Sequence, residues 1–316
     1  ELLSHIKTRI GKENLRQYAT LRAQVMGPEG PSVEERCEKL QKNLETRHEF
    51  AQRIHVLVNP AESCALISLM AFPFQGPPWQ AIVDWSTSDE YRQQILEQAP
   101  VLIRNWLKDL RELTDPPKSL SLRLNLDRAF DGLEEILNAS GWIRGNERYE
   151  FKAPVTELPA NWEGPLAWKD LNQAGMDLTA RIMEEAGQGP EWDDNDSGES
   201  LIDAYLSDKE LTNDPSCIEV GFLPDGKPAA FVVAQTAPSD GWCTIMFMGI
   251  IPEVRGHGFG QWVHRRGFEL MRRQGGKQYH GGTSAGNKSM LRLFEKHGCR
   301  PYAHLAEWVF RMKNDE

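Results

Sequence analysis

The feature that most restricts the fold is a strand that runs directly into a glycine-alternating turn and then a helix. The apolar run Trp242–Ile251 has strand length, Pro252 follows it, and glycines then occupy positions 256, 258 and 260. Alternate glycines let the backbone curl tightly and aim successive N–H groups in one direction. The positive end of the next helix, predicted at Gly258–Gln274, adds to this field. The segment is therefore predicted to form a cradle for an anion.

Two other phosphate-binding folds fit this turn poorly. A dinucleotide fold needs G-x-G-x-x-G in a parallel βαβ unit and an acid on the next strand, but the next predicted strand, Gln278–Thr283, has none. A nucleotide P-loop needs G-K-[ST] after its last glycine, and here Gly260 precedes Gln261-Trp262. An ordinary glycine-rich turn before a solvated basic helix stays open as the alternative.

Length and composition indicate two globular domains, with 316 residues of which 40% are hydrophobic. A net charge of −10 argues against a general nucleic-acid binder. No run approaches the ~20 apolar residues of a membrane helix, and Glu1–Gly11 lacks the pattern of a secretory signal. Five scattered cysteines without a CxxC pair indicate free thiols in a reducing compartment. We expect a cytoplasmic protein with no metal and no nucleic-acid or membrane partner.

The second half has a readable order of elements, β-αα-βββ-α-β-α-β, which implies an α/β fold with a mixed sheet flanked by helices. Its predicted elements are Leu166–Asp170, Met176–Ala186, Glu199–Leu206, Cys217–Leu223, Pro228–Thr236, Trp242–Ile251, Gly258–Gln274, Gln278–Thr283, Lys288–His297 and Leu305–Arg311. Before them, the proline-containing segment Ala153–Pro165 reads as a linker or a crossing strand.

The first half carries a fainter copy of the same order. A shift of 157 residues places Gly141 on Gly298 and Glu150-Phe151 on Glu307-Trp308. The same shift superposes the apolar residues of two predicted helices, Leu133, Ile136 and Leu137 on Met290, Leu293 and Phe294. We therefore expect a tandem repeat with domains at residues 1–155 and 156–316. Residues 1–50 read as mainly helical, so the first copy is expected to lack its opening strand.

Two motifs in the second half resemble the GNAT superfamily of N-acetyltransferases. The run Arg255-Gly256-His257-Gly258-Phe259-Gly260 is similar to that family's R/Q-x-x-G-x-G/A signature. The run Asn287–Cys299 looks like its second motif, in which an Asn opens a helix and an aromatic residue precedes a glycine. The resemblance covers about residues 160–312. The tandem layout resembles mycothiol-synthase-like acyltransferases, and implies two mostly antiparallel sheets, each with a V-shaped central opening.

The resemblance also implies roles for residues and identifies acetyl-CoA as the co-substrate. Backbone groups of Ile250 and Ile251 would pair with the pantetheine arm, and N–H groups from Arg255 to Gln261 would hold the pyrophosphate. Asn287 would contact the cofactor arm, and Phe294 would lie near the thioester. The implied cofactor-binding residues are Ile250, Ile251, Arg255, Gly256, His257, Gly258, Phe259, Gly260, Gln261, Asn287 and Phe294.

The first copy departs from the family pattern. No glycine occurs between Gly76 and Gly132, and the turn equivalent to the anion cradle, Trp85–Tyr91, contains two acids. Like charges there would repel a pyrophosphate. We expect that this copy does not bind CoA in the family's manner and that it is structural or forms one wall of the acceptor site.

The chemistry needs a base for the amine, a donor for the oxyanion and, optionally, an acid for the thiolate. A backbone N–H on Trp242–Ile251 would serve the oxyanion. The family often has a Tyr where this chain has Phe294, which cannot donate a proton. Tyr302 is then a candidate acid, and Glu219 and Asp240 are candidate bases. Deprotonation through water by several groups is the alternative.

We therefore expect acetyl transfer from acetyl-CoA to a primary amine of a small molecule or peptide. The acidic run Glu191–Asp196 could attract a cationic acceptor, or be a solvated loop. Three alternatives stay open: a longer acyl-CoA, an alcohol as acceptor, and a CoA-binding regulatory or scaffold protein without catalysis. The chain is expected to be a monomer with an internal pseudo-dimer, or a homodimer.

Overall fold

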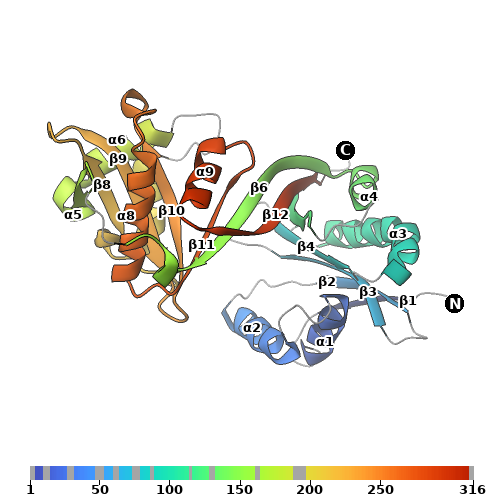
Figure 1. The fold of residues 1–316 in the computed structure, drawn as a ribbon. Coiled ribbons are helices and arrows are strands. Elements are labelled where there is room, and N and C mark those ends of the chain that lie inside the picture. Colours follow the sequence, from blue (N-terminus) through green and yellow to red (C-terminus); the bar gives the residue numbers. More distant parts are fainter. Residues whose placement is uncertain are drawn as a thin grey trace. The chain divides into compact units, whose positions relative to one another are not determined.

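The computed structural model describes residues 4–9, 15–26, 32–46, 53–59, 64–72, 79–85, 89–113, 116–127, 132–160, 164–187 and 197–312. The chain divides into two compact units (Figure 1). Unit 1 consists of Glu1–Glu147 with Leu305–Glu316, and unit 2 is Arg148–His304. The predicted division at residue 155 thus differs from these boundaries, because each half of the chain contributes its last strand to the other unit.

Unit 1 has six strands among its described residues, in the order β1-β2-β3-β4-β5-β12. Neighbours are antiparallel except β4 and β5, which pair in parallel over only three positions. The elements are β1 (Ser4–Arg9), α1 (Leu15–Met26), α2 (Val33–Thr46), β2 (Arg53–Asn59), β3 (Cys64–Phe72), β4 (Trp79–Trp85), η1 (Asp89–Tyr91), α3 (Arg92–Arg111), β5 (Ser119–Asn125), α4 (Leu133–Ala139) and the end of β12 (Arg300–Arg311). The expectation that the first copy lacks an opening strand is wrong, because β1 pairs with β2.

Unit 2 repeats this topology with the order β7-β8-β9-β10-β11-β6 in its described residues. Its elements are β6 (Ile143–Pro154), η2 (Val155–Glu157), β7 (Ala167–Asp170), α5 (Leu171–Ala174), α6 (Met176–Gly187), α7 (Gly198–Ser207), η3 (Pro215–Cys217), β8 (Ile218–Phe222), β9 (Pro228–Thr236), β10 (Trp242–Ile250), η4 (Pro252–Val254), α8 (Gly260–Arg273), β11 (Gln278–Ser284) and α9 (Lys288–Lys296). Both units therefore confirm the predicted mixed α/β fold of tandem, mostly antiparallel sheets.

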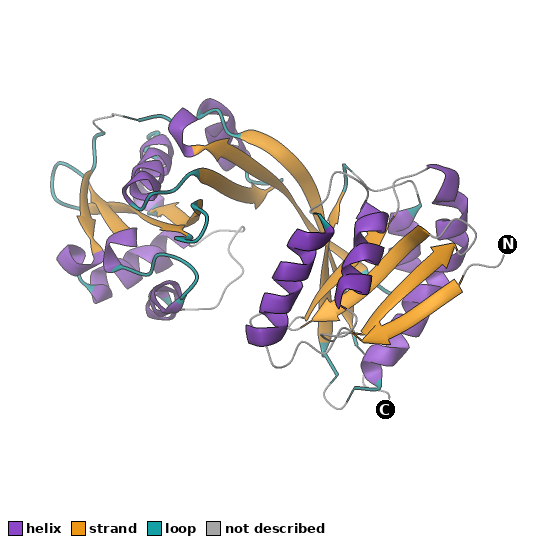
Figure 2. Cartoon of the chain, turned by 90° about the horizontal axis from the view of Figure 1, so that it is seen from below, coloured by secondary structure: helices purple, strands orange, loops and turns teal. Residues whose placement is uncertain are grey.

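The alternation of buried residues along β9 explains how helices cover both faces of the unit 2 sheet (Figure 2). Ala230 and Val232 belong to the apolar cluster that contains Phe268 of α8. Phe231 and Val233 belong to the cluster that contains Met183 of α6. Because successive strand side chains point to opposite faces, α8 and α6 lie on opposite sides of the sheet.

Hydrogen bonds attach residues 153–160 of the predicted linker, which the structure describes, to the rest of unit 2. Val155 donates its N–H to the carbonyl of Lys277 over 2.9 Å. The Arg272 guanidinium donates to the carbonyls of Val155, Leu158 and Pro159 at 2.7–3.3 Å. One guanidinium nitrogen of α8 thus contacts three carbonyls of this segment, which fixes the path of the chain after β6.

Candidate functional site

The centre of unit 2 is a gap between two parallel strands. β10 and β11 pair only at Trp242↔Gln278 and Cys243↔Tyr279. Beyond these pairs β11 continues alongside β6, from Gln278↔Pro154 to Ser284↔Arg148. The later part of β10 therefore has an edge to which β11 does not bond, and this is the V-shaped opening that the family resemblance implied.

A register shift in β10 lies beside this gap. Ile245 is opposite Ala234 of β9, whereas Phe247 is opposite Val233, so Met246 is an extra residue. A bulge leaves such a residue out of the ladder and re-aims its neighbours. Ile251 donates its N–H to Ala229 of β9 over 3.0 Å. By alternation, the N–H groups of Met248 and Ile250 then point to the gap.

The glycine turn after β10 has the geometry of an anion cradle. Gly256 and Gly258 have φ of 82° and 78°, a left-handed conformation that favours glycine. Within the described part of the chain, no hydrogen bond uses the backbone N–H groups of residues 256–261. Six successive donors therefore precede and open α8, whose first turn carries no side-chain cap. Such an arrangement suits a phosphate or pyrophosphate.

Arg255 makes hydrogen bonds within the protein that the resemblance did not imply. Its N–H donates to the carbonyl of Pro252 over 3.2 Å, within the turn η4. Its side chain donates to the carbonyls of Ile250 and Ala186, each over 2.9 Å. The guanidinium therefore ties the end of β10 to α6, so the free donors of the turn start at Gly256. Ile251 likewise bonds to β9 rather than facing the gap.

The remaining residues of the turn connect it to α9. His257 is exposed, and its ring Nδ1 lies 3.0 Å from the carbonyl oxygen of Arg255. Phe259 packs against the apolar cluster beneath α8. A Cβ at Gly260 would lie 3.3 Å from Leu293 of α9. The Gln261 side chain accepts a hydrogen bond from the Lys296 ammonium, which links the two helices.

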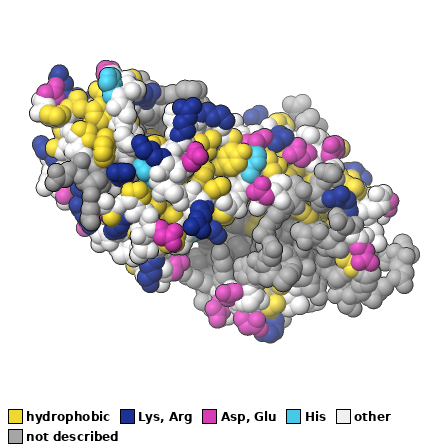
Figure 3. Space-filling model, in the orientation of Figure 1, with side chains coloured by type: hydrophobic (Ala, Val, Ile, Leu, Met, Phe, Trp, Pro, Cys, Tyr) yellow, Lys and Arg dark blue, Asp and Glu magenta, His cyan; other side chains and the backbone are white. Residues whose placement is uncertain are grey.

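Helices α8 and α9 carry more basic than acidic residues, although the chain has a net charge of −10. Figure 3 shows Lys and Arg side chains beside hydrophobic ones on the visible face of unit 2. The basic residues of α8 and α9 are Arg265, Arg266, Arg272, Arg273, Lys288, Arg292 and Lys296. Three of these arginines have other partners: Arg266 and Arg273 face Glu219, and Arg272 binds the carbonyls after β6. The other basic residues contribute the positive charge that is compatible with an anionic ligand.

The two residues of the second motif that the resemblance assigns to the cofactor, Asn287 and Phe294, differ in exposure. Asn287 caps the helix, and its side-chain oxygen accepts from the N–H of Met290 over 3.0 Å. The amide nitrogen stays on the other side of the side chain as a donor. Phe294, in contrast, is 1% exposed and stacks on Phe151 with 4.1 Å between ring centroids. Its ring forms part of the apolar cluster beneath α8 and α9.

A polar network that the sequence analysis missed lies within this cluster. His264 of α8 has its Nδ1 2.9 Å from Nδ1 of His297 and its Nε2 3.2 Å from the Tyr279 hydroxyl. Burial lowers the pKa of His264 well below its usual range and raises that of Tyr279 well above it. In the sequence, His264 occupies an apolar helix position, and its partners are 33 and 15 residues away, so no local pattern signals the contact.

The opposite face of the sheet carries a second group of side chains near the start of the gap. The His280 ring lies 5.8 Å from the Tyr302 ring and 5.9 Å from Trp242. The Lys152 ammonium lies 5.2 Å from the centroid of Tyr302. Burial, followed by the charge of Lys152, lowers the pKa of His280, while Asp240 opposes this. His280 therefore favours the neutral imidazole that a general base needs.

The three predicted catalytic residues separate in the structure. Tyr302 lies in the group with His280, and burial followed by Glu150 raises the pKa of its hydroxyl. Asp240 is exposed in the β9–β10 hairpin and accepts from the N–H of Trp242 over 2.9 Å. Asp240 acts on His280 through its charge, which raises the pKa of the imidazole. Tyr302 and Asp240 thus flank one candidate base that sequence reasoning did not select.

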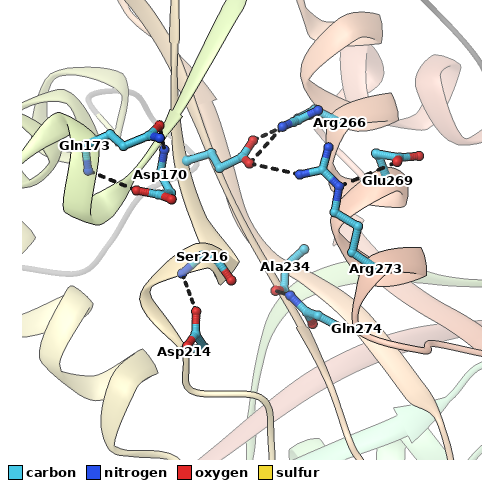
Figure 4. Close-up of polar contacts among 10 residues, drawn as sticks. Asp170, Gln173, Asp214, Ser216, Ala234, Arg266, Glu269, Arg273 and Gln274 are labelled. Atoms are coloured by element: carbon cyan, nitrogen blue, oxygen red, sulfur yellow. Dashed lines mark hydrogen bonds and ion pairs between the residues drawn. The ribbon is translucent and has the colours of Figure 1, made fainter.

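Glu219 lies on the α8 side of the sheet, because it is opposite Val232 of β9, which belongs to the apolar cluster of α8. Figure 4 shows the side chains of Arg266 and Arg273, which extend from α8. The Glu219 side chain is 6% exposed, and one oxygen accepts from Arg266 Nη2 over 2.8 Å. The second oxygen accepts from Arg266 Nε, and Nη1 of Arg273 lies 3.6 Å from the first oxygen. Both carboxylate oxygens are engaged by arginine, an arrangement typical of a structural ion pair.

The acidic run, the cysteines and potential metal or membrane-spanning groups add no further candidate site among the described residues. The acidic run Glu191–Asp196 lies outside them. No group of three or more His, Cys, Asp and Glu side chains suits a metal in the described ranges, and in the same ranges no helix could cross a membrane. Cys37, Cys217, Cys243 and Cys299 are free, and burial raises the pKa of the Cys243 and Cys299 thiols to about 12.

Comparison with known proteins agrees with this geometry. Residues 179–299 match the Acetyltransferase (GNAT) family. A GCN5-related N-acetyltransferase from Sphaerobacter thermophilus is similar in structure, with a TM-score of 0.67 and 15% identity over 99% of this chain and 98% of that one. A tandem GNAT protein from the clavulanic acid biosynthesis pathway has a TM-score of 0.52 and 12% identity over the full length of both chains.

A third similar structure is a GCN5-related glucosamine N-acetyltransferase region in a fungal multi-domain β-N-acetylglucosaminidase. Its TM-score is 0.62 with 12% identity, and the alignment covers 98% of this chain and 38% of that one. No curated protein sequence matches this chain. At these identities the structural likenesses report the fold, and the sequence match to residues 179–299 identifies the family of that domain.

Proposed function

Because residues 179–299 form a domain of the GNAT acetyltransferase family, we propose that unit 2 transfers an acetyl group from acetyl-CoA to a primary amine. One observation carries the proposal: six successive free N–H groups at residues 256–261 follow a strand whose edge is open. A phosphate cradle joined to an unpaired strand edge suits a ligand with a pyrophosphate and an extended amide-containing arm, which are the two recognition elements of CoA.

Each part of the donor has a candidate partner. The N–H groups of residues 256–261 would bind the pyrophosphate. Backbone groups of Met248 and Ile250 would bond to the pantetheine amides as a neighbouring strand does. The Asn287 amide would donate to the same arm. Ile251, Arg255 and Phe294 would act indirectly, by fixing β10 and forming the apolar floor.

The bulge leaves a backbone N–H that would serve as the oxyanion donor. A backbone N–H at Met246–Met248 that β11 leaves unpaired can donate to the tetrahedral oxyanion. His280 follows the last paired residue of β11, and we assign it as the base that accepts the amine proton. Tyr302 and Asp240 would position the acceptor and adjust the charge of His280. The buried thiols are protonated, which favours direct transfer over an acyl-cysteine intermediate.

Unit 1 has the same topology but no equivalent of the glycine turn in its described residues. The helix after β4 is preceded by η1, which begins with Asp89 and Glu90. We propose that this copy does not bind CoA and supports the fold of the chain. A cytoplasmic location and a monomeric or homodimeric state remain predictions.

A direct test is the release of CoA from acetyl-CoA in the presence of an amine panel. The panel includes glucosamine, polyamines, aminoglycosides and peptide α-amines, with matched alcohols and longer acyl-CoA donors in parallel. Amine-dependent release that His280→Gln abolishes supports the proposal. Binding of acetyl-CoA without turnover on any acceptor would favour a CoA-binding regulatory protein, and faster release from longer donors would identify a different acyl group.

A further inference from the structure

An exposed apolar surface surrounds the candidate base His280. Among the described residues of unit 2, four large hydrophobic side chains are exposed, namely Met176, Trp242, Met246 and Tyr302. Trp242 and Tyr302 flank His280, and they are 36% and 44% exposed. Met246 is 41% exposed and is the extra residue of the β10 bulge beside the gap. Apolar side chains that gather in this way, rather than singly, indicate a binding surface.

The side chains of Trp242, His280, Lys152 and Tyr302 share one face of the sheet. The residues beside the first three in β10, β11 and β6 belong to the apolar cluster beneath α8 and α9. Because successive strand side chains alternate, Trp242, His280 and Lys152 point to the other side. Lys152 is exposed and His280 is half-buried. A ligand in solvent can therefore reach the candidate base from this face.

Lys152 provides a positive charge beside His280. It is directly opposite His280 in the β6–β11 ladder, and its ammonium lies 5.2 Å from the centroid of the Tyr302 ring. Among the described residues Lys152 has no ion-pair partner, whereas the next carboxylate on this face of β6, Glu150, is bound to Arg148 over 2.8 Å. The charge of Lys152 is therefore available to an anionic group of a ligand.

The uncompensated charge next to His280 is positive. The ion pair of Arg148 and Glu150 lies over Gly282, because a Cβ there would overlap both side chains. Glu150 thus presents no unpaired carboxylate to a cationic acceptor. Burial has the largest effect on the pKa of His280 and lowers it; Lys152 lowers it further, and Asp240 opposes this with a smaller effect. An acceptor that carries a negative charge therefore complements this surface better than a polycation does.

Trp242, His280 and Lys152 lie on three neighbouring strands, β10, β11 and β6. The outer two strands are separated by two strand spacings, about 10 Å. An α-amino acid carries its amine and its carboxylate on one carbon, so the amine can meet His280 while the carboxylate meets Lys152. The Tyr302 ring already faces the Lys152 ammonium, which leaves Trp242 as the exposed ring for the ligand side chain. An aromatic side chain suits such a contact.

We propose that the acceptor is a free aromatic α-amino acid, whose ring packs on Trp242 and whose carboxylate binds Lys152. The assignment rests on the proposed acyl transfer and names the class of its second substrate. With these two contacts made, the α-amine lies beside His280. The charge of Lys152 disfavours a protonated amine at this place, which helps to supply the neutral amine that attacks a thioester. A polyamine would instead bring further positive charge to Lys152.

Four acceptors separate the ring from the carboxylate in the first test. Phenylalanine has both groups, phenethylamine has only the ring, alanine has only the carboxylate, and ethylamine has neither. We expect kcat/KM, calculated per neutral amine, to fall about 10-fold without the carboxylate, which is the low end for a hydrogen bond to a charged group. It should fall about 3–10-fold without the ring. Spermine that is a better acceptor than phenylalanine would overturn the assignment.

The second test repeats the comparison with variants, at about pH 8.5 so that His280 is neutral in each. Lys152→Gln should lower the ratio of kcat/KM for phenylalanine to that for phenethylamine about 10-fold, through KM, and Lys152→Arg should restore it. The matched control is Lys169→Gln on β7, whose ammonium also lies over a ring, 4.7 Å from the centroid of Phe222. Trp242→Leu should instead lower the ratio for phenylalanine to alanine. An unchanged ratio in folded Lys152→Gln would overturn the carboxylate contact.

Binding is measured without turnover by fluorine NMR titration of para-fluorophenylalanine, in the presence and absence of CoA. We expect the wild type and Lys169→Gln to bind this probe, and Lys152→Gln and Trp242→Leu to bind it more weakly. Transfer to another amine by a wild type that neither binds the probe nor uses phenylalanine would overturn this assignment and leave the proposed function intact. Binding of the probe without transfer to any amine would support the acceptor surface and overturn the proposed acyl transfer.

Discussion

Replacing Glu219 with Gln should destabilise unit 2 without slowing acyl transfer. The substitution keeps the size of the side chain and one oxygen acceptor, but it removes the charge that faces Arg266 and Arg273. Glu219 is 6% exposed and Arg266 17% exposed, so water can replace little of the lost interaction. The sequence analysis selected Glu219 as a candidate base, which makes the variant a test of role as well as of stability.

The magnitude follows from the burial of the pair. Truncating one partner of a buried ion pair costs about 3–5 kcal/mol. The amide retains part of the hydrogen bonding, so we expect a loss of about 2–3 kcal/mol in the free energy of unfolding. For a unit of this size the unfolding midpoint should fall by roughly 4–12 °C. The matched control is Glu185→Gln, since the Glu185–Arg181 pair is 42% and 61% exposed and should contribute under about 0.5 kcal/mol.

The assay combines thermal unfolding of both variants with transfer rates measured well below the unfolding transition. The reasoning predicts a lower midpoint and an unchanged rate for Glu219→Gln. A variant with wild-type stability and a large loss of rate would refute it, because Glu219 would then serve the acceptor amine rather than α8.

Further predictions concern the helices and the turn. His297 should make the free energy of unfolding depend on pH. Burial lowers its pKa from 6.5 to about 4, so between pH 4 and pH 6.5 the imidazole is protonated in the unfolded state but neutral in the folded state. This group should lower the free energy of unfolding by about 3 kcal/mol from pH 6.5 to pH 4. Denaturant titration should show a smaller loss over the same pH range for His297→Asn. Equal pH dependence in the wild type and the variant would contradict the assignment to His297. Asn287→Ala should cost about 1 kcal/mol through loss of the α9 cap, seen in the same titration, whereas no change would show that the cap is redundant. Gly256→Ala meets no atom within 4 Å, so its cost of about 1–2 kcal/mol comes from φ alone; a larger loss would indicate an unseen clash.

Local sequence patterns were sufficient to predict the strand, the turn and the helix start that make up the candidate donor site. The strand Trp242–Ile250, the glycines at 256 and 258 and the cap at Asn287 were all predicted, because each depends on residues close in sequence. Arg255 was the exception. Its side chain bonds to Ala186, 69 residues away, and no turn pattern contains that information.

Contacts between distant residues account for what the sequence could not show. The sequence analysis selected Glu219 as a candidate base, yet its carboxylate pairs with Arg266, which is 47 residues away. The exchange of last strands also escaped prediction, since β6 and β12 have similar patterns and either could complete either sheet. The pairing of β1 with β2 was missed because Ser4–Arg9 has only weak alternation.

The most direct test of the account is calorimetric titration of acetyl-CoA and CoA into the wild type and a Gly258→Glu variant. Gly258 has φ of 78° and lies among the free N–H groups, so a carboxylate there would both strain the turn and repel a pyrophosphate. The account predicts micromolar binding by the wild type and none by the variant, with the variant still folded by circular dichroism. Absence of binding to the wild type would contradict the acyl-CoA site, and equal binding by both would place the donor somewhere other than this turn.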